Sequence, residues 1–177
     1  MPNPLAWRSN EAAMVEPHLA YLNLGSNIQP ETNLPRALNR LAEYGEIQNV
    51  SSVWESKAVG ATGPNYLNVC AKFGSAFTRA ALKEHVIQQI ETQLGRIRTA
   101  NKYASRTIDI DIVIFDDEFI HPDSWKLAYV VVPLAELYPE YRNPKTGETV
   151  GEIAARLRQE VWLELRPGLL GQLSRGR

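Results

Sequence analysis

The segment from residue 96 to residue 118 holds the densest group of reactive side chains, and its charge changes sign along its length. Residues 96–108 carry four cationic side chains and no acid, whereas residues 109–118 carry five acids and no base. The cations are Arg96, Arg98, Lys102 and Arg106. Arginine and lysine side chains bind phosphate oxygens, while clustered carboxylates bind hard cations. The polarised segment therefore predicts a site for phosphoryl-type transfer from a metal-bound polyphosphate.

Asp109 and Asp111 are the candidate metal ligands. They lie two residues apart in a run, 108–115, that has the pattern of a strand, so their carboxylates project from one face while Ile110 points to the other. Two carboxylates this close repel each other unless a cation lies between them, and oxygen ligands with open positions suit Mg²⁺ bound together with phosphates. An Asp-x-Asp pair alone is more often structural, and an arginine-rich loop alone is more often surface. Their conjunction favours a site, although no P-loop sequence accompanies it.

A second group of candidates lies on the predicted strand 66–73. Tyr66 and Asn68 share one face of it, and they offer an aromatic surface for stacking and an amide with both a donor and an acceptor. This is the chemistry that recognises a flat heterocycle, although the same residues are also ordinary on an exposed sheet face. Trp54 and Tyr129 are candidate stacking partners, with core packing the alternative for Trp54. His121 follows the acidic strand closely enough to reach a phosphate.

The apolar periodicity predicts the elements that must position these residues. Strands are expected at 19–24, 47–54, 66–73 and 108–115, and helices from Asn33 to Gly45 and from Thr78 to Gly95. The order β-α-β-β-α-β is that of an α+β, ferredoxin-like fold, in which two helices cover one face of an antiparallel sheet. The ligand site is expected on the other face. A further unit at 128–137 and a helix near 150–157 extend the core.

Composition predicts one domain and excludes several classes of protein. The chain has 177 residues, of which 44% are hydrophobic, and a formal net charge of -1, so neither a nucleic-acid partner nor a membrane partner is expected. One cysteine, no zinc motif and no signal-like apolar run favour a cytoplasmic protein. We expect a flexible extension at 1–17, the domain at 18–160 and a tail at 161–177. The expected state is a monomer, with a homodimer as the alternative.

Six short motifs occur in order between residues 19 and 157. They are Gly25–Asn27, Glu55–Gly60, Tyr66–Asn68, Glu91 with Leu94–Arg98, Arg106–Asp111 and Val132–Glu136. This ordered set resembles the motifs of the 6-hydroxymethyl-7,8-dihydropterin pyrophosphokinase family. The resemblance implies a ferredoxin-like enzyme of folate biosynthesis, an ATP-dependent diphosphotransferase that transfers pyrophosphate from ATP to the pterin hydroxymethyl group and releases AMP.

The resemblance also implies a role for each candidate residue. Asp109 and Asp111 would bind two Mg²⁺ ions, and Arg96 and Arg106 would steady the triphosphate in the transition state. The ATP side would comprise Arg98, Lys102, His121, Gln88 and Glu91. The pterin side would comprise Ser56, Val59, Tyr66, Asn68 and Tyr129, with the ring between the two tyrosines. The loops 55–64 and 99–105 would close over ATP.

Two departures from the family pattern leave alternatives open. Residues 102–106 read Lys-Tyr-Ala-Ser-Arg where the family usually has Arg-Trp-Gly-Pro-Arg, and the chain is short between Phe115 and His121. A catalytically lapsed or altered-specificity relative that binds a pterin or a nucleotide as a regulator is therefore the first alternative. A ferredoxin-like RNA-binding module is the second, although the acids on the predicted ligand face and the missing RNP1 pattern speak against it.

Overall fold

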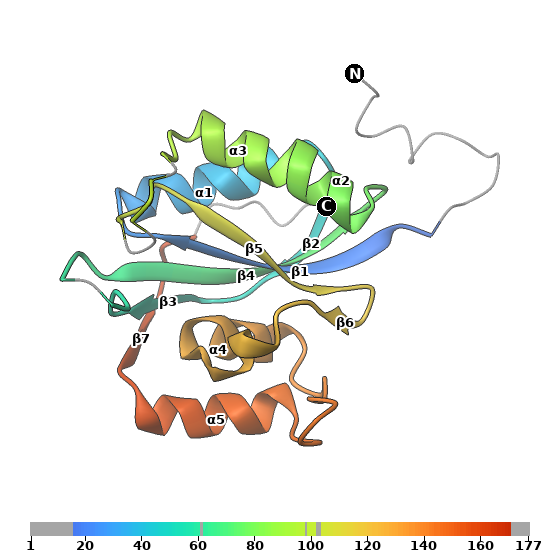
Figure 1. Cartoon of the computed structure of the whole chain (residues 1–177), viewed down its shortest axis with the longest axis vertical. Helices are drawn as coiled ribbons and strands as arrows, with labels where there is room; N and C mark the ends of the chain where they lie inside the picture. The colour runs from blue at the N-terminus through green and yellow to red at the C-terminus, as the bar shows by residue number, and fades with distance from the viewer. Residues whose placement is uncertain (1–15, 61, 98, 102–103, 171–177) are drawn as a thin grey trace.

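A computed structural model describes residues 16–60, 62–97, 99–101 and 104–170 of the chain (Figure 1). The strands are β1 (His18–Ser26), β2 (Glu46–Val50), β3 (Val53–Ser56), β4 (Tyr66–Ser75), β5 (Asp109–Phe115), β6 (Glu118–Phe119) and β7 (Leu163–Arg166). The helices are α1 (Pro30–Leu41), α2 (Arg79–Ala81) continued by the π-helix η2 (Leu82–Ile87) and α3 (Gln88–Gln93), the 3-10 helix η3 (Pro122–Lys126), α4 (Ala128–Leu137) and α5 (Val150–Glu160).

The strands form one antiparallel sheet with β1 near its centre. The sheet order is β6-β5-β1-β4-β3-β7. Strand β2 also pairs with β4, along a different part of β4 from the part that pairs with β3. Strand β1 pairs with β4 on one side and with β5 on the other. The order β5-β1-β4-β3 is that of the ferredoxin-like split βαβ fold, so the predicted fold class is confirmed.

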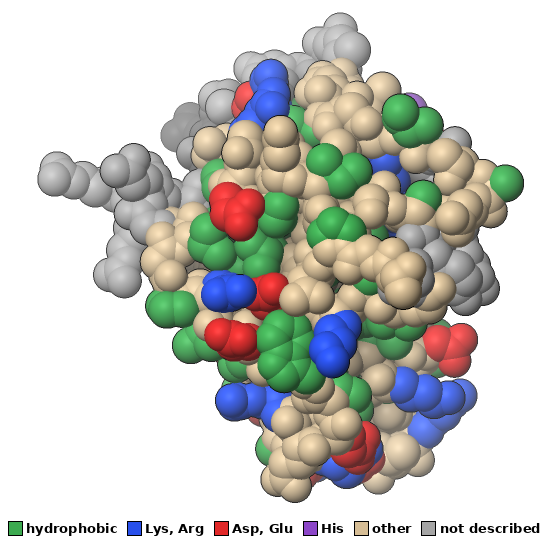
Figure 2. Space-filling model, turned by 90° about the vertical axis from the view of Figure 1, so that its left-hand side faces the viewer, with side chains coloured by type: hydrophobic (Ala, Val, Ile, Leu, Met, Phe, Trp, Pro, Cys, Tyr) green, Lys and Arg blue, Asp and Glu red, His purple; other side chains and the backbone are tan. Residues whose placement is uncertain are grey.

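The sheet has helices on both faces, and they divide the core in two (Figure 1). Helices α1 and α2–α3 cover one face, where Leu22 and Leu24 of β1 are fully buried, as the sequence predicts. Helix α4 covers part of the opposite face, where Tyr21 and Cys70 are buried, and α5 packs against α4 as an outer layer. The face on which the ligand site is expected is therefore open only where α4 does not cover it. Figure 2 shows charges of both signs interspersed where α5 lies.

Local structure corrects the expected boundaries of two elements. The expected strand 47–54 is two strands, because the Ser51 hydroxyl accepts a hydrogen bond from the Cys70 amide and the Ser52 amide donates to Glu136. Helix α1 begins at Pro30 after Gln29, whose φ of 46° is left-handed, and not at Asn33. Asn33 is buried inside the helix and donates to the Ile28 carbonyl.

The sheet continues past the expected end of the domain. Strand β7 pairs with β3 over four residues, so part of the expected tail 161–177 is a strand of the sheet. The expected extension 1–17 and residues 171–177 lie almost entirely outside the described residues. Within the described part of the chain, no helix has the length and apolarity that crossing a bilayer requires.

Candidate active site

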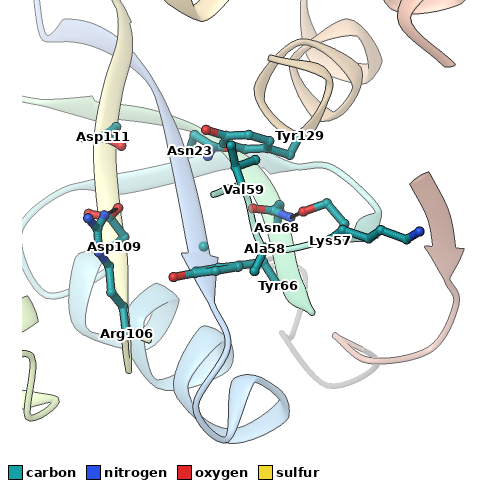
Figure 3. A pocket seen from close by; sticks show the side chains of 12 residues that line it. Asn23, Lys57, Ala58, Val59, Tyr66, Asn68, Arg106, Asp109, Asp111 and Tyr129 are labelled. Carbon is teal, nitrogen blue, oxygen red and sulfur yellow. Dashed lines mark hydrogen bonds and ion pairs between the residues drawn. The ribbon is translucent and has the colours of Figure 1, made fainter. Parts of the chain in front are cut away.

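A cavity of about 370 Å³ opens where β1, β4 and β5 end beside α4 (Figure 3). It lies on the sheet face opposite α1 and α2–α3, which is the face on which the sequence predicts the ligand site. Its lining combines residues from four strands or their ends and one helix: Asn23, Gly25, Ser56, Lys57, Ala58, Val59, Tyr66, Asn68, Arg106, Asp109, Asp111 and Tyr129. The cavity therefore brings Arg106, Asp109 and Asp111 together with Tyr66 and Asn68, whereas Arg96 is not part of its lining.

The strand register sets the floor of this cavity. Gly25 on β1 pairs with Asp109 on one side and with Asn68 on the other. A Cβ atom at Gly25 would lie 3.1 Å from the Asn68 amide oxygen and 3.7 Å from the Tyr66 ring. The missing side chain thus leaves a flat floor between the acids and the aromatic side, and a planar ligand can lie directly on the strand.

Asp109 is held by two arginines. Arg96 lies 2.6 Å from one Asp109 oxygen, and Arg106 forms an ion pair with the other. Arg96 also pairs with Glu91, whose Oε1 atom accepts a hydrogen bond of 3.0 Å from the Ile110 amide. Glu91 is only 2% exposed, so it lies beneath Arg96 and does not line the cavity.

Asp111 remains accessible from the cavity and is electrostatically strained. Burial, followed by the charges of Asp109 and Glu91, raises the pKa of Asp111 to about 6 from its ordinary value of 3.8, although Arg96 and His121 act in the opposite direction. A cation beside the pair would relieve this repulsion. The described residues contain no group of three or more potential metal-ligating side chains. The pair therefore fits an ion such as Mg²⁺ that takes its remaining ligands from phosphate and water.

The opposite side of the cavity is aromatic. Tyr66 and Tyr129 form two walls of a slot, and Asn68 lies between them (Figure 3). The Asn68 amide nitrogen donates to the Ser56 hydroxyl at 2.9 Å and to the Trp54 carbonyl at 3.3 Å. These two hydrogen bonds occupy the amide nitrogen of Asn68 and leave its oxygen facing the slot. The sequence suggested instead that both the nitrogen and the oxygen contact the ligand. Trp54 is buried in the core and donates to Glu136.

Asn27 connects the two expected loops, although in the sequence it is only the last residue of the Gly25–Asn27 motif and has no expected role. Its amide oxygen accepts a hydrogen bond of 2.7 Å from the Arg106 amide. Its nitrogen donates to the Pro64 carbonyl and to the Ser105 hydroxyl, both at 3.2 Å. The signal available in the sequence was an asparagine after the first strand, but only the fold shows that its side chain reaches both loops.

The remaining predicted ATP residues lie away from the cavity lining or cannot be placed. His121 is exposed just before η3, and Gln88 is exposed at the start of α3. His121 is nevertheless near enough to act on Asp111 electrostatically. Arg98 and Lys102 lie outside the described residues.

Comparison with known proteins points to one family. The model of the 7,8-dihydro-6-hydroxymethylpterin-pyrophosphokinase (HPPK) family matches residues 21–139. A 2-amino-4-hydroxy-6-hydroxymethyldihydropteridine pyrophosphokinase of Synechocystis is 31% identical over 163 residues, which cover 86% of this chain and 83% of that protein. The protein of the same name from Aquifex aeolicus is 34% identical over 134 residues, covering 70% of this chain and 82% of its own.

Solved structures with the same fold include the HPPK-DHPS of Plasmodium falciparum. One of these, named as carrying A437G with STZ-DHP, superposes with a TM-score of 0.63 at 13% identity and is matched over 88% of this chain and 48% of its own. Another, named as wild type with pterin and p-hydroxybenzoate, has a TM-score of 0.62 at 15% identity, with coverages of 82% and 44%. This chain thus spans less than half of those longer proteins, and at such identity they support the fold alone.

Proposed function

We propose that the cavity between the tyrosine slot and the Asp109–Asp111 pair is the active site of this chain, which belongs to the 7,8-dihydro-6-hydroxymethylpterin-pyrophosphokinase family. The enzyme transfers pyrophosphate from ATP to the hydroxymethyl group of 6-hydroxymethyl-7,8-dihydropterin and releases AMP, a step of folate synthesis. One observation carries the assignment of the site: a single cavity joins a co-facial carboxylate pair and Arg106 to an aromatic slot with an amide.

Asp109 and Asp111 would hold Mg²⁺, with two ions as the family resemblance implies. When bound, Mg²⁺ neutralises the charge that develops on the phosphates in the transition state. The donor set supports this role, because two hard oxygen ligands face one side and the pKa of Asp111 is raised first by burial and then by the neighbouring acids. The carboxylates would supply only part of the coordination shell, and the triphosphate and water would complete it.

Arg96 and Arg106 would bind the triphosphate. Both contact Asp109 in the described structure, so phosphate oxygens would share or replace these contacts as ATP enters. Glu91 fits a positioning role better than the predicted direct contact with ATP, because it is buried and binds the Arg96 guanidinium from below. His121, Gln88, Arg98 and Lys102 stay proposals for the ATP side.

The pterin would lie over Gly25 between Tyr66 and Tyr129. The Asn68 amide oxygen would accept a hydrogen bond from a ring N–H, and Ser56 and Val59 would close the side of the slot. This pose directs the hydroxymethyl group toward the acids. Its oxygen then forms a bond with the β-phosphorus while the bond from that phosphorus to the α,β-bridging oxygen breaks; AMP leaves and the hydroxyl proton passes to solvent.

A direct assay tests the function. Purified protein incubated with ATP, Mg²⁺ and 6-hydroxymethyl-7,8-dihydropterin should form AMP and the pyrophosphorylated pterin in equal amounts, as measured by chromatography. Excess EDTA should stop the reaction, because it removes Mg²⁺. ATP without its metal ion adds negative charge next to the two carboxylates and cannot offset their repulsion. Tight pterin binding without any AMP would instead support the lapsed relative.

The aromatic slot gives a second prediction. Replacing Tyr66 with alanine should raise KM for the pterin by about tenfold and leave KM for ATP nearly unchanged, since an aromatic contact contributes about 0.5–1.5 kcal/mol beyond its buried area. Tyr66→Phe keeps the ring and serves as the matched control, with kinetics close to those of the unchanged enzyme. Equal KM values for all three proteins would place the pterin elsewhere.

A further inference from the structure

An ion pair joins the end of strand β3 to the C-terminal strand β7, which lies beside it (Figure 1). Arg166 of β7 pairs with Glu55 of β3, and its Nε and Nη2 atoms both contact the carboxylate oxygen Oε2. The other oxygen of Glu55, Oε1, accepts a hydrogen bond of 2.7 Å from the Asn65 side chain. Strand β7 lies outside residues 21–139, the part of the chain that the family model matches. The ion pair therefore connects the site to a segment that the family motifs do not include.

Glu55 and Asn65 lie at the two ends of the loop that lines the pterin side of the cavity. Glu55 precedes Ser56, the last residue of β3, and Asn65 precedes Tyr66, the first residue of β4. Ser56 and Tyr66 pair across the two strands. Residues 57–59 of the loop line the cavity. The hydrogen bond between the side chains of Glu55 and Asn65 therefore closes the loop at its base.

The Glu55 carboxylate points away from the cavity. Side chains alternate along β3, so Ser56 faces the cavity whereas Glu55 shares the opposite face with Val53, which belongs to the core under α1. Together with Asn65 and Arg166, Glu55 lines a second cavity. Glu55 and Arg166 can therefore affect a ligand of the active site only through the loop.

The surroundings of Glu55 explain why its carboxylate needs a cation. Its side chain is only 12% exposed. Glu164 of β7 lies directly opposite Glu55 and so adds negative charge on the same face of the sheet. A buried carboxylate is stable when a cation and hydrogen bonds compensate its charge. Without the Arg166 guanidinium, the Glu55 carboxylate would turn toward water, and this movement would break its hydrogen bond with Asn65.

We propose that Arg166 is a positioning residue for the pterin: its ion pair with Glu55 keeps the base of the loop closed and holds Ser56 and Val59 at the side of the slot. The proposal rests on the proposed function, which assigns the slot to the pterin. The Ser56 hydroxyl also accepts a hydrogen bond from the Asn68 amide nitrogen, so an opened loop would release the amide that contacts the ring. The acid pair lies on β5, which β1 and β4 separate from β3, so the effect is confined to the pterin side.

Steady-state kinetics with Mg²⁺ in excess test the proposal. Arg166→Ala should raise KM for the pterin by about three- to tenfold, the effect of weakening one hydrogen bond at the slot, and leave kcat and KM for ATP nearly unchanged. Arg166→Lys keeps the charge and should recover most of this loss. Arg156→Ala is the matched control: Arg156 of α5 is exposed to a similar extent and pairs with Glu148 and Glu160, so its loss should leave every kinetic constant unchanged.

A double variant distinguishes positioning from a general loss of structure. In Arg166→Ala combined with Glu55→Gln, the glutamine oxygen still accepts the hydrogen bond from Asn65 and needs no cation, so KM for the pterin should return toward its normal value. Calorimetric titration with 6-hydroxymethyl-7,8-dihydropterin, in the presence of Mg²⁺ and a non-cleavable ATP analogue, should show the same loss and recovery of affinity without turnover.

Two results would overturn the role of Arg166 while leaving the proposed function intact. One is a normal KM for the pterin in Arg166→Ala; the other is a fall in kcat together with equal rises in both KM values, which a general loss of folded protein would produce. If the unchanged protein neither formed AMP nor bound the pterin, the proposed function would fail, and the role of Arg166 would fail with it.

Discussion

Replacing Asp111 with asparagine is expected to reduce kcat by about a thousandfold or more, since the change removes one of the two carboxylates proposed to hold Mg²⁺ and metal stabilisation of the transition state amounts to several kcal/mol. The side chain keeps its size, so binding of the pterin in the slot should be nearly unchanged. The measurement is AMP release at saturating ATP, pterin and Mg²⁺. Asp123→Asn, an exposed aspartate of η3, provides a matched control with unchanged kcat.

The same substitution should stabilise the protein without metal, and the sign follows from the pKa. The folded-state pKa of Asp111 is about 6, above the ordinary value of 3.8, so the folded state binds the proton more tightly than the unfolded state does. The protonated Asp111 carboxyl therefore favours the folded state at low pH. This contribution to the free energy of unfolding is lost as the pH rises from about 4 to about 6. In EDTA, Asp111→Asn should have a higher Tm than the unchanged protein at pH 8, and the difference should vanish near pH 4.

A Tm of Asp111→Asn below that of the unchanged protein at pH 8 would contradict this account. It would mean that the carboxylate stabilises the apo fold through a contact, rather than being repelled by Asp109 and Glu91. Added Mg²⁺ should raise the Tm of the unchanged protein but not that of the variant, because only a ligand that prefers the folded state stabilises it.

The parts of this site that the sequence predicted are those fixed by short-range patterns. The alternation around Asp109 and Asp111 on β5, and around Tyr66 and Asn68 on β4, determines which side chains share a face. Because β1 lies between these strands, the ferredoxin-like order then brings the two pairs together. Periodicity therefore sufficed for the fold class and for bringing these two pairs into one cavity.

The missed features depend on contacts between distant parts of the chain. Asn27 bonds with Pro64 and Ser105, which are 37 and 78 residues away, and no local pattern encodes such a contact. The Asn23 amide oxygen, which is buried without a hydrogen-bond partner in the described part of the chain, likewise depends on how the strands pack in the sheet. Burial of Glu91 beneath Arg96 follows from docking α3 against β5, so spacing alone could not distinguish a ligand contact from a buried ion pair.

Arg96→Ala should lower both activity and stability, for separable reasons. Loss of a preorganised charged donor to the phosphates should reduce kcat by about 10²- to 10³-fold. The change also removes the guanidinium from Glu91, whose side chain is 3% exposed, and breaking a buried pair from one side costs about 3–5 kcal/mol. Thermal unfolding of the variant should show the corresponding drop in Tm.

A double variant separates the two effects. In Arg96→Ala combined with Glu91→Gln the buried carboxylate is gone, while a glutamine oxygen can still accept the hydrogen bond from the Ile110 amide. We expect Tm to recover part of its loss, because a neutral amide replaces the buried carboxylate that has lost the Arg96 guanidinium. The value of kcat should stay at the level of the single variant, since the donor to the phosphates is still missing. If kcat recovered together with Tm, Arg96 would act only by supporting the fold.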